Sequence, residues 1–146
     1  MEDLSLYFTD PAGEDMHSGS PTLGSKSIPL GIARNIGVGS KKVFLKVIVT
    51  AALTTGGKTL GVDLITDSAA GLATSMVIVK AGLILIPALA AIGATFYAEL
   101  PEADTYKAFL GIQTDGHSDP PGAGNIKAFL TLEPGVHRIY PTTSLV

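Results

Sequence analysis

The chain of 146 residues favours a single domain that is long enough to bury a hydrophobic core. Because it contains no cysteine, disulfide bonds and thiolate–metal sites are excluded. Ten Lys and Arg against thirteen Asp and Glu give a formal net charge of -3, and the scattered basic residues disfavour direct binding of nucleic acid.

The chain is rich in apolar residues: 46% are hydrophobic and 16% are charged, whereas soluble domains average about 25% charged residues. Two interpretations stay open. Apolar surface could be left for a partner to cover, or the core could be large and rich in alanine. The 17 glycines and 9 prolines lie between apolar runs and indicate the turns of a β protein.

Residues 28–50 carry the clearest structural signal. A short apolar strand pattern enters a glycine-rich turn around Arg34, and a long alternating strand follows. Over residues 42–50 every second residue is Val or Leu, and β-branched residues dominate, which favours a strand over a helix. Residues 54–57 then have the composition of a turn.

The next segment, residues 60–67, alternates again, with an apolar inward face and an outward face that carries Asp63 and Asp67. We interpret these two carboxylates as a solvated strand surface rather than a general acid and base. About eight strands and no helix predict an all-β fold, an antiparallel β-sandwich or barrel, for which the jelly roll is a common arrangement. The main predicted strands are residues 42–50, 60–67, 75–80, 83–86, 94–100, 106–114 and 126–132.

We expect one domain, residues 1–146, with a β-sandwich over residues 26–132 and irregular arms at residues 1–25 and 133–146. Most of the first arm is rich in Gly, Pro and Ser without periodicity, which is typical of a long loop. We expect it to be docked on a partner or on its own domain. The first residues lack the basic and apolar regions of a secretory signal.

Residues 81–98 carry no charge and reach the lower length limit of a membrane-spanning helix. Pro87 and Gly93 divide this run into two pieces of strand length, and only Lys80 offers a basic flank. We therefore predict two buried strands with a corner between them rather than a membrane helix.

Two glycine motifs are incomplete as nucleotide-binding sites. Residues 57–59 (Gly-Lys-Thr) lack the earlier glycine of a phosphate-binding loop, because position 52 is Ala, and a strand rather than a helix follows. Residues 37–39 (Gly-Val-Gly) lack the third glycine of a dinucleotide-binding fingerprint. Both motifs are interpreted as turns, and no cofactor is predicted.

The histidines do not form a site. His17, His117 and His137 lie in predicted loops or arms, and no two have close ligand spacing. His117 lies between Asp115 and Asp119, which we interpret as a polar loop rather than a metal site or an acid–base pair. No catalytic, cofactor-binding or metal-binding residue is therefore predicted, and no enzymatic activity.

The basic residues around the long strand have two interpretations each. Lys41, Lys42 and Lys46 protect an edge strand against aggregation, or they dock on an acidic partner surface. Arg34 ties its glycine-rich turn to a carboxylate or to backbone carbonyls, or it is a free surface arginine.

Residues 30–39 read Leu-Gly-Ile-Ala-Arg-Asn-Ile-Gly-Val-Gly and lead into an alternating strand. They follow a short aliphatic start at residues 4–10 and an arm rich in Gly, Ser and Pro. Residues 60–68 and the Ala-Phe-Leu-Thr at 128–131 continue the same order. In these motifs the chain resembles the capsid cement (decoration) proteins of tailed phages, of the type found on Bordetella podoviruses.

The resemblance implies an antiparallel β-sandwich of jelly-roll type with no catalysis. Such a structural virion protein lies on the outside of an icosahedral capsid and bridges neighbouring major capsid subunits, which stabilises the shell. The implied partners are the major capsid protein and a second copy of the chain, as a homodimer rather than a trimer, with no direct contact to nucleic acid or membrane. Assembly in the reducing host cytoplasm suits a chain without cysteine.

A function from another class stays open as the alternative: a carbohydrate- or receptor-binding β-sandwich of a phage tail or surface. Such a module needs exposed aromatic residues clustered on a loop face. The chain has four Tyr, five Phe and no Trp, and most of these lie in strand patterns. A small hydrolase on a β-sandwich would need a triad or a metal set, for which the chain shows no pattern.

Overall fold

The computed structural model describes residues 6–15, 22–31, 43–54, 60–74, 76–77, 84–86, 90–100, 106–115 and 123–132. Within these residues the fold is all-β, as the alternation predicted, and every strand pair is antiparallel. The strands are β1 (Thr22–Leu23), β2 (Ile28–Pro29), β3 (Phe44–Thr54), β4 (Leu60–Asp67), β5 (Met76–Val77), β6 (Ile84–Ile86), β7 (Thr95–Glu99), β8 (Phe109–Asp115) and β9 (Ala123–Thr131).

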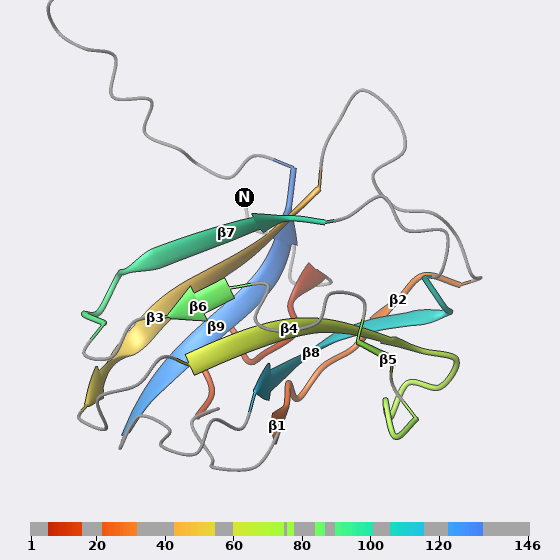
Figure 1. The fold of residues 1–146 in the computed structure, drawn as a ribbon, viewed down its shortest axis with the longest axis horizontal. Helices are drawn as coiled ribbons and strands as arrows, with labels where there is room; N and C mark the ends of the chain where they lie inside the picture. The colour runs from red at the N-terminus through yellow and green to blue at the C-terminus, as the bar shows by residue number, and fades with distance from the viewer. Residues whose placement is uncertain are drawn as a thin grey trace, which may run out of the picture.

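Two sheets form a sandwich (Figure 1). The smaller sheet has the order β7-β3-β9. The larger sheet has the order β1-β8-β4-β5, in which β2 also pairs with β8 and β6 also pairs with β4. In Figure 1 β7 lies above, and β4 and β8 lie below it. The predicted antiparallel β-sandwich is confirmed, whereas a jelly-roll topology stays a prediction.

The core lies between the sheets, because each sheet turns an apolar face toward the other. On β3, Leu45, Val47 and Val49 are fully buried, so the Val and Leu face of the alternating residues 42–50 is the one that faces the core. Burying one such side chain is worth about 1.5–3 kcal/mol, so packing between the sheets is the main stabilising term. The same core cluster includes Val62, Leu64, Leu110, Ile112, Ile126 and Ala128.

Several strand ends differ from the predicted ones. β4 has the predicted bounds, but β3 continues four residues beyond its predicted end at position 50. Its pairing with β9 continues through register shifts after Val49 and Ala51, which the alternation pattern does not reveal. β9 begins at Ala123, three residues before its predicted start at position 126, because it pairs with this extension of β3.

The apolar run at residues 81–98 contains β6 and most of β7, which agrees with the prediction of two strands. Gly93, with φ at 85°, lies in the turn before β7, and its N–H donates to the Val49 carbonyl at 2.8 Å. β7 is half-buried rather than buried, because it lies at the edge of the smaller sheet. No helix in the described part of the chain is long and apolar enough to cross a membrane.

Residues 6–15, which we call the N-terminal strap, close one side of the sandwich. Tyr7 forms an antiparallel bridge with Phe129 of β9. The Phe8 N–H donates to the Ala128 carbonyl at 2.9 Å, and the Phe8 carbonyl accepts from the Lys26 N–H at 3.0 Å. The strap therefore joins β9 of the smaller sheet to the segment that follows β1 in the larger sheet.

A second contact fixes the other end of the strap. The backbone groups of Glu14 and Ile126 exchange hydrogen bonds of 2.8 and 2.9 Å. The Glu14 carboxylate accepts from the Asp10 N–H at 2.6 Å and from the Ser25 N–H at 3.1 Å, and the Ser25 hydroxyl also donates to it. Because each contact lies within one chain, the described part of the first predicted arm is docked on its own domain.

The boundary of the sandwich also lies earlier than predicted. β1 pairs with β8 in the register Thr22–Thr114 and Leu23–Gln113, so the larger sheet already includes residues before position 26. A two-residue strand in a segment rich in Gly and Ser has no periodicity to reveal it. The second predicted arm, residues 133–146, lies outside the described residues.

Candidate functional site

Asp67, at the end of β4, is fully buried, and Asp63 is only 8% exposed. The prediction that these carboxylates form a solvated strand face is therefore wrong. β4 lies inside the larger sheet, between β8 on one side and β5 and β6 on the other, and it is buried at every position. Alternating apolar and polar residues indicate a solvent-exposed outer face only where one side of the sheet is in contact with water.

Hydrogen bonds from the following loop satisfy the buried Asp67 carboxylate. Oδ1 accepts from the Ser68 N–H at 2.6 Å, and Oδ2 accepts from the Thr74 N–H at 2.9 Å. Removal from water raises the pKa of Asp67, but hydrogen bonds from Thr74, Ser68 and Ala69 outweigh this effect and hold the pKa below its ordinary value. The carboxylate stays ionised and fixes the loop, which is a structural role rather than an acid–base one.

We expect Asp67→Asn to destabilise the protein most at neutral pH. A carboxylate with a lowered folded pKa stabilises the fold above its unfolded pKa of about 4, and this contribution is lost as the pH falls through the folded value. The difference between the urea midpoints of wild type and Asp67→Asn should therefore shrink between neutral pH and about pH 3. A difference that stays constant or grows on acidification would contradict the role of the ionised carboxylate.

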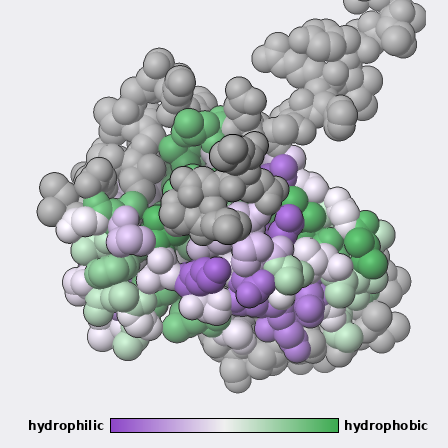
Figure 2. Space-filling view, turned by 180° about the vertical axis from the view of Figure 1, so that it is seen from behind, coloured by the Kyte–Doolittle hydropathy of each residue, from purple (hydrophilic) through white to green (hydrophobic). Residues whose placement is uncertain are grey.

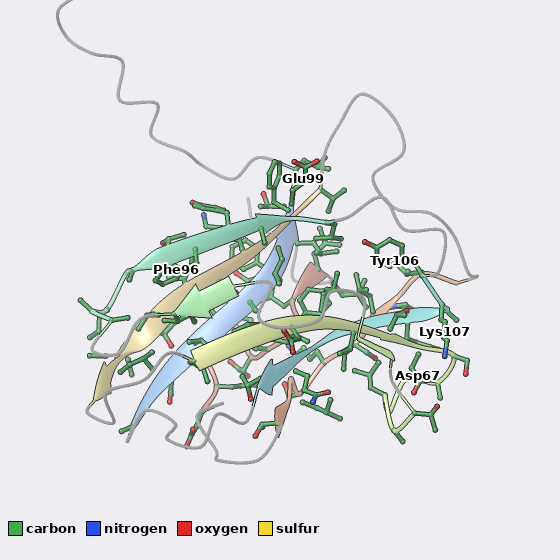
Figure 3. All side chains as sticks on the ribbon, viewed as in Figure 1. Asp67, Phe96, Glu99, Tyr106 and Lys107 are labelled. Carbon is green, nitrogen blue, oxygen red and sulfur yellow. The ribbon has the colours of Figure 1, made fainter. Side chains whose placement is uncertain are left out.

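Asp67 lies at the same end of the molecule as Tyr106 and Lys107 (Figure 3). The buried Thr66 hydroxyl joins the neighbouring segments there: it accepts from the Lys107 N–H at 2.8 Å and donates to the Phe109 carbonyl at 2.8 Å. Burial raises the pKa of Tyr106 to about 12, so this phenol stays protonated at neutral pH. Neither the phenol nor the Asp67 carboxylate is poised for proton transfer near neutral pH.

A row of side chains crosses the outer face of the smaller sheet. Lys46 on β3 pairs in register with Tyr97 of β7 and Phe129 of β9. Its Nζ lies 5.4 Å and 5.6 Å from the centroids of these two rings. Tyr7 of the strap stacks on Phe129 with centroids 4.8 Å apart, and Lys127 places its Nζ 5.9 Å from the Phe129 centroid. The row combines ammonium groups with aromatic rings on one surface.

Phe44 and Ile48 lie two residues before and after Lys46 and therefore share its side of the sheet. We define the lysine–aromatic face as the half-buried Phe44, Lys46, Ile48, Tyr97 and Lys127 together with the buried Phe129. The smaller sheet separates this face from the core, as β7 illustrates: in Figure 3, Glu99 and Phe96 project to opposite sides of this strand. Phe96 packs against the core cluster, whereas Glu99 is exposed.

Lys46 lies on the central strand of the smaller sheet, so the interpretation that it protects an edge strand is wrong. Its docking to an acidic partner stays a prediction. The alternation of residues 42–50 placed Lys46 on the outer face, but its aromatic neighbours depend on the register with β7 and β9, which the sequence does not specify. Lys41 and Lys42 lie outside the described residues.

Exposed large hydrophobic side chains lie at separate points of the described surface. They are Leu23 at 40%, Ile92 at 69% and Leu132 at 56% exposure. Figure 2 shows hydrophilic residues near the middle of the face seen from behind, with hydrophobic residues on both sides of them. Isolated exposed apolar residues are normal on a protein surface, so these positions do not define an interface by themselves.

No group of three or more His, Cys, Asp or Glu that could hold a metal ion occurs within the residues that the structure describes. The remaining positions that the sequence singled out lie outside these residues: His17, His117, His137, Asp119, Arg34 and the motifs at 37–39 and 57–59. Among the described side chains, the lysine–aromatic face is the constellation best suited to binding, because it joins apolar area with charge on a rigid sheet.

Comparison with known proteins leaves the family open. No protein-family model matches the chain, and a search of curated proteins finds no match. The functional proposals therefore depend on the sequence motifs, the fold and the surface of this molecule.

Proposed function

We propose that this protein decorates the outside of an icosahedral phage capsid, where it binds the major capsid protein and bridges neighbouring subunits to stabilise the shell. In this role it is a structural component of the virion rather than an enzyme. It acts through non-covalent contacts, as a homodimer of a jelly-roll sandwich. Assembly takes place in the host cytoplasm.

One observation carries the proposal: residues 30–39, with the order of segments around them, resemble capsid cement proteins. The resemblance implied a β-sandwich, and the fold is an antiparallel β-sandwich. The connection between the two sheets also suits a protein that bridges capsid subunits. The strap ties the two sheets together along one side, so the sandwich can transmit load between the surfaces that it contacts. A lattice that repeats one weak contact many times gains strength from high effective concentration.

We expect the purified protein to co-sediment with expanded phage heads that lack it. Heads that carry it should survive heating and chelator treatment better than heads without it, because each bound copy connects neighbouring subunits. The measurement is the protein bound per head in a sedimentation assay, followed by the midpoint of heat-induced DNA release. Absence of binding to expanded heads, or equal heat and chelator stability of decorated and undecorated heads, would contradict the proposal.

The alternative, a carbohydrate- or receptor-binding module, has less support from the surface. Sugar-binding platforms present an open aromatic ring to the ligand. In the described part of the chain every aromatic side chain is buried or half-buried, and Phe129 and Tyr7 of the aromatic row are only 6% and 1% exposed. Binding of the protein to host-cell glycans in preference to heads would favour this alternative.

A further inference from the structure

We propose that the lysine–aromatic face is the docking surface of this protein, and that its partner is a protein surface that presents carboxylates. This inference rests on the proposed function, under which that surface belongs to the capsid shell. Lys46 is its central residue, since it lies between the rings of Tyr97 and Phe129. The half-buried side chains of Phe44, Ile48 and Tyr97 around it supply the apolar contact area, and the buried Phe129 supports Lys46 from below.

The charge of the face is complementary to an acidic partner. The whole chain has a formal net charge of -3, yet the central row of this face presents the ammonium groups of Lys46 and Lys127 over Phe129. Local charge opposite to that of the molecule selects for a negative partner and accelerates correctly oriented encounters. A second copy docked through the same face would place lysines against lysines, which disfavours self-association there.

The geometry of Lys46 makes its charge effective in binding. The rings of Tyr97 and Phe129 come from the two strands that flank β3, and the Lys46 Nζ lies 5.4 Å and 5.6 Å from their centroids. A side chain that is ordered before binding loses less entropy when it pairs with a carboxylate. Because Lys46 is half-buried, a partner that covers it removes the remaining water and strengthens the ion pair.

The apolar part of the face has the composition of an interface core. Phe44 and Ile48 flank Lys46 on the same strand and are half-buried. Protein–protein interfaces are enriched in aromatic residues at their centre, with charged groups that set orientation. All three residues stand on the central strand, whose backbone pairs with β7 on one side and β9 on the other.

The same observations favour a protein over a nucleic acid. A protein that binds a phosphate backbone neutralises several phosphates with a basic stripe. Here two lysines stand among apolar residues, and the exposed Glu99, which pairs in register with Phe44, lies at one end of the face. A sheet surface of this composition fits apolar contacts around a few carboxylates rather than a continuous polyanion.

The test compares the binding of three variants to expanded heads that lack the protein and have been treated with nuclease. Lys46→Glu reverses the charge, and Lys46→Met keeps an unbranched stem over the rings without the charge. Lys26→Glu is the matched control, because Lys26 is exposed and lies in the segment between β1 and β2 of the other sheet. The thermal midpoint of each free variant shows whether its fold is intact.

We expect Lys46→Glu to lower the apparent affinity by about tenfold or more, as for close charge pairs across interfaces. Lys46→Met should cause a smaller loss, and Lys26→Glu should bind like wild type. Wild-type binding should weaken between about 0.1 M and 1 M salt, where the screening length falls from about 10 Å to about 3 Å, and Lys46→Met should show a weaker salt dependence.

The outcomes separate this inference from the proposed function. If wild type binds heads and Lys46→Glu binds equally well, the docking surface is elsewhere, but the decoration function stands. If wild type does not bind heads, both are overturned. If nuclease treatment abolishes wild-type binding, the partner is nucleic acid and the inference is wrong.

Discussion

Removal of residues 1–15 is expected to unfold the protein, not merely to weaken its attachment to a capsid. Phe8 is fully buried in the core between the sheets, and Tyr7, which is 1% exposed, packs on Phe129 at the other face of the smaller sheet. The strap also closes the gap between the sheets, since Phe8 bonds to Ala128 on one side and Lys26 on the other. Deletion would expose these backbone groups together with apolar surface.

Phe8→Ala measures the same contribution without deleting the chain. Truncation of a buried phenylalanine costs about 3–5 kcal/mol, because the transfer free energy is lost and a cavity remains. Small domains have a net stability of about 5–15 kcal/mol, so this variant should be marginally folded. Leu132→Ala is the matched control, because Leu132 is 56% exposed and should tolerate truncation with a change of less than about 0.5 kcal/mol.

The stability of the truncated protein, Phe8→Ala and Leu132→Ala is measured by urea unfolding followed by circular dichroism. Head binding is then measured only for the variants that fold. A truncated protein with native stability that fails to bind heads would show that residues 1–15 form a capsid-binding arm. A truncated protein that is unfolded assigns them to the scaffold. The structure leads us to expect the second result, which moves the expected docking surface from the N-terminal arm to the sheet face around Lys46.

The longer strands of the sandwich could be predicted because their side chains alternate. Residues 60–67 have the predicted bounds, and the alternating Val and Leu face of residues 42–50 is the buried one. Both segments belong to strands in which period-two patterning determines which side chains enter the core. That these segments form strands could therefore be predicted from the local sequence, although the pairing of the strands could not.

The contacts of the strap and of the Asp67 loop were not predicted, for different physical reasons, although docking of the first arm on its own domain was one of two expectations. The strap depends on contacts between distant positions, such as the bond from the Ala128 N–H to the Thr9 hydroxyl, which spans 119 residues. An irregular segment carries no periodic signal for such pairing. For Asp67 a local signal did exist, since Asp followed by Ser and Ala is typical of a side-chain-capped turn. The alternating pattern of residues 60–67 instead suggested that Asp67 is exposed to solvent.

The lysine–aromatic face shows what register adds to sequence. The outward position of Lys46 follows from alternation, but the rings of Tyr97 and Phe129 come from strands far along the chain. The observed register places Lys46 between these two rings. A one-residue slip of either strand would turn that ring toward the core and leave Lys46 beside a small or apolar inward residue.

A second large effect is expected where the strap meets the larger sheet. A Cβ atom at Gly24 would lie 2.5 Å from the Phe8 carbonyl oxygen and 3.0 Å from Cγ1 of Ile112. The carbonyl cannot easily move, because it accepts the hydrogen bond from the Lys26 N–H at 3.0 Å. Gly24 is also fixed, since its own N–H donates to the Ile112 carbonyl at 3.0 Å.

We therefore expect Gly24→Ala to destabilise the protein by about 1–3 kcal/mol or more, because the added methyl group pushes the strap away from the sheet. Gly71→Ala is the matched control: nothing lies within 4 Å of its added Cβ, and its backbone has no positive φ. That variant should be neutral or about 0.4–1 kcal/mol more stable, since alanine restricts the unfolded chain. The measurement is the urea midpoint of each variant. Equal midpoints for Gly24→Ala and Gly71→Ala would mean that the strap does not pack tightly against Gly24.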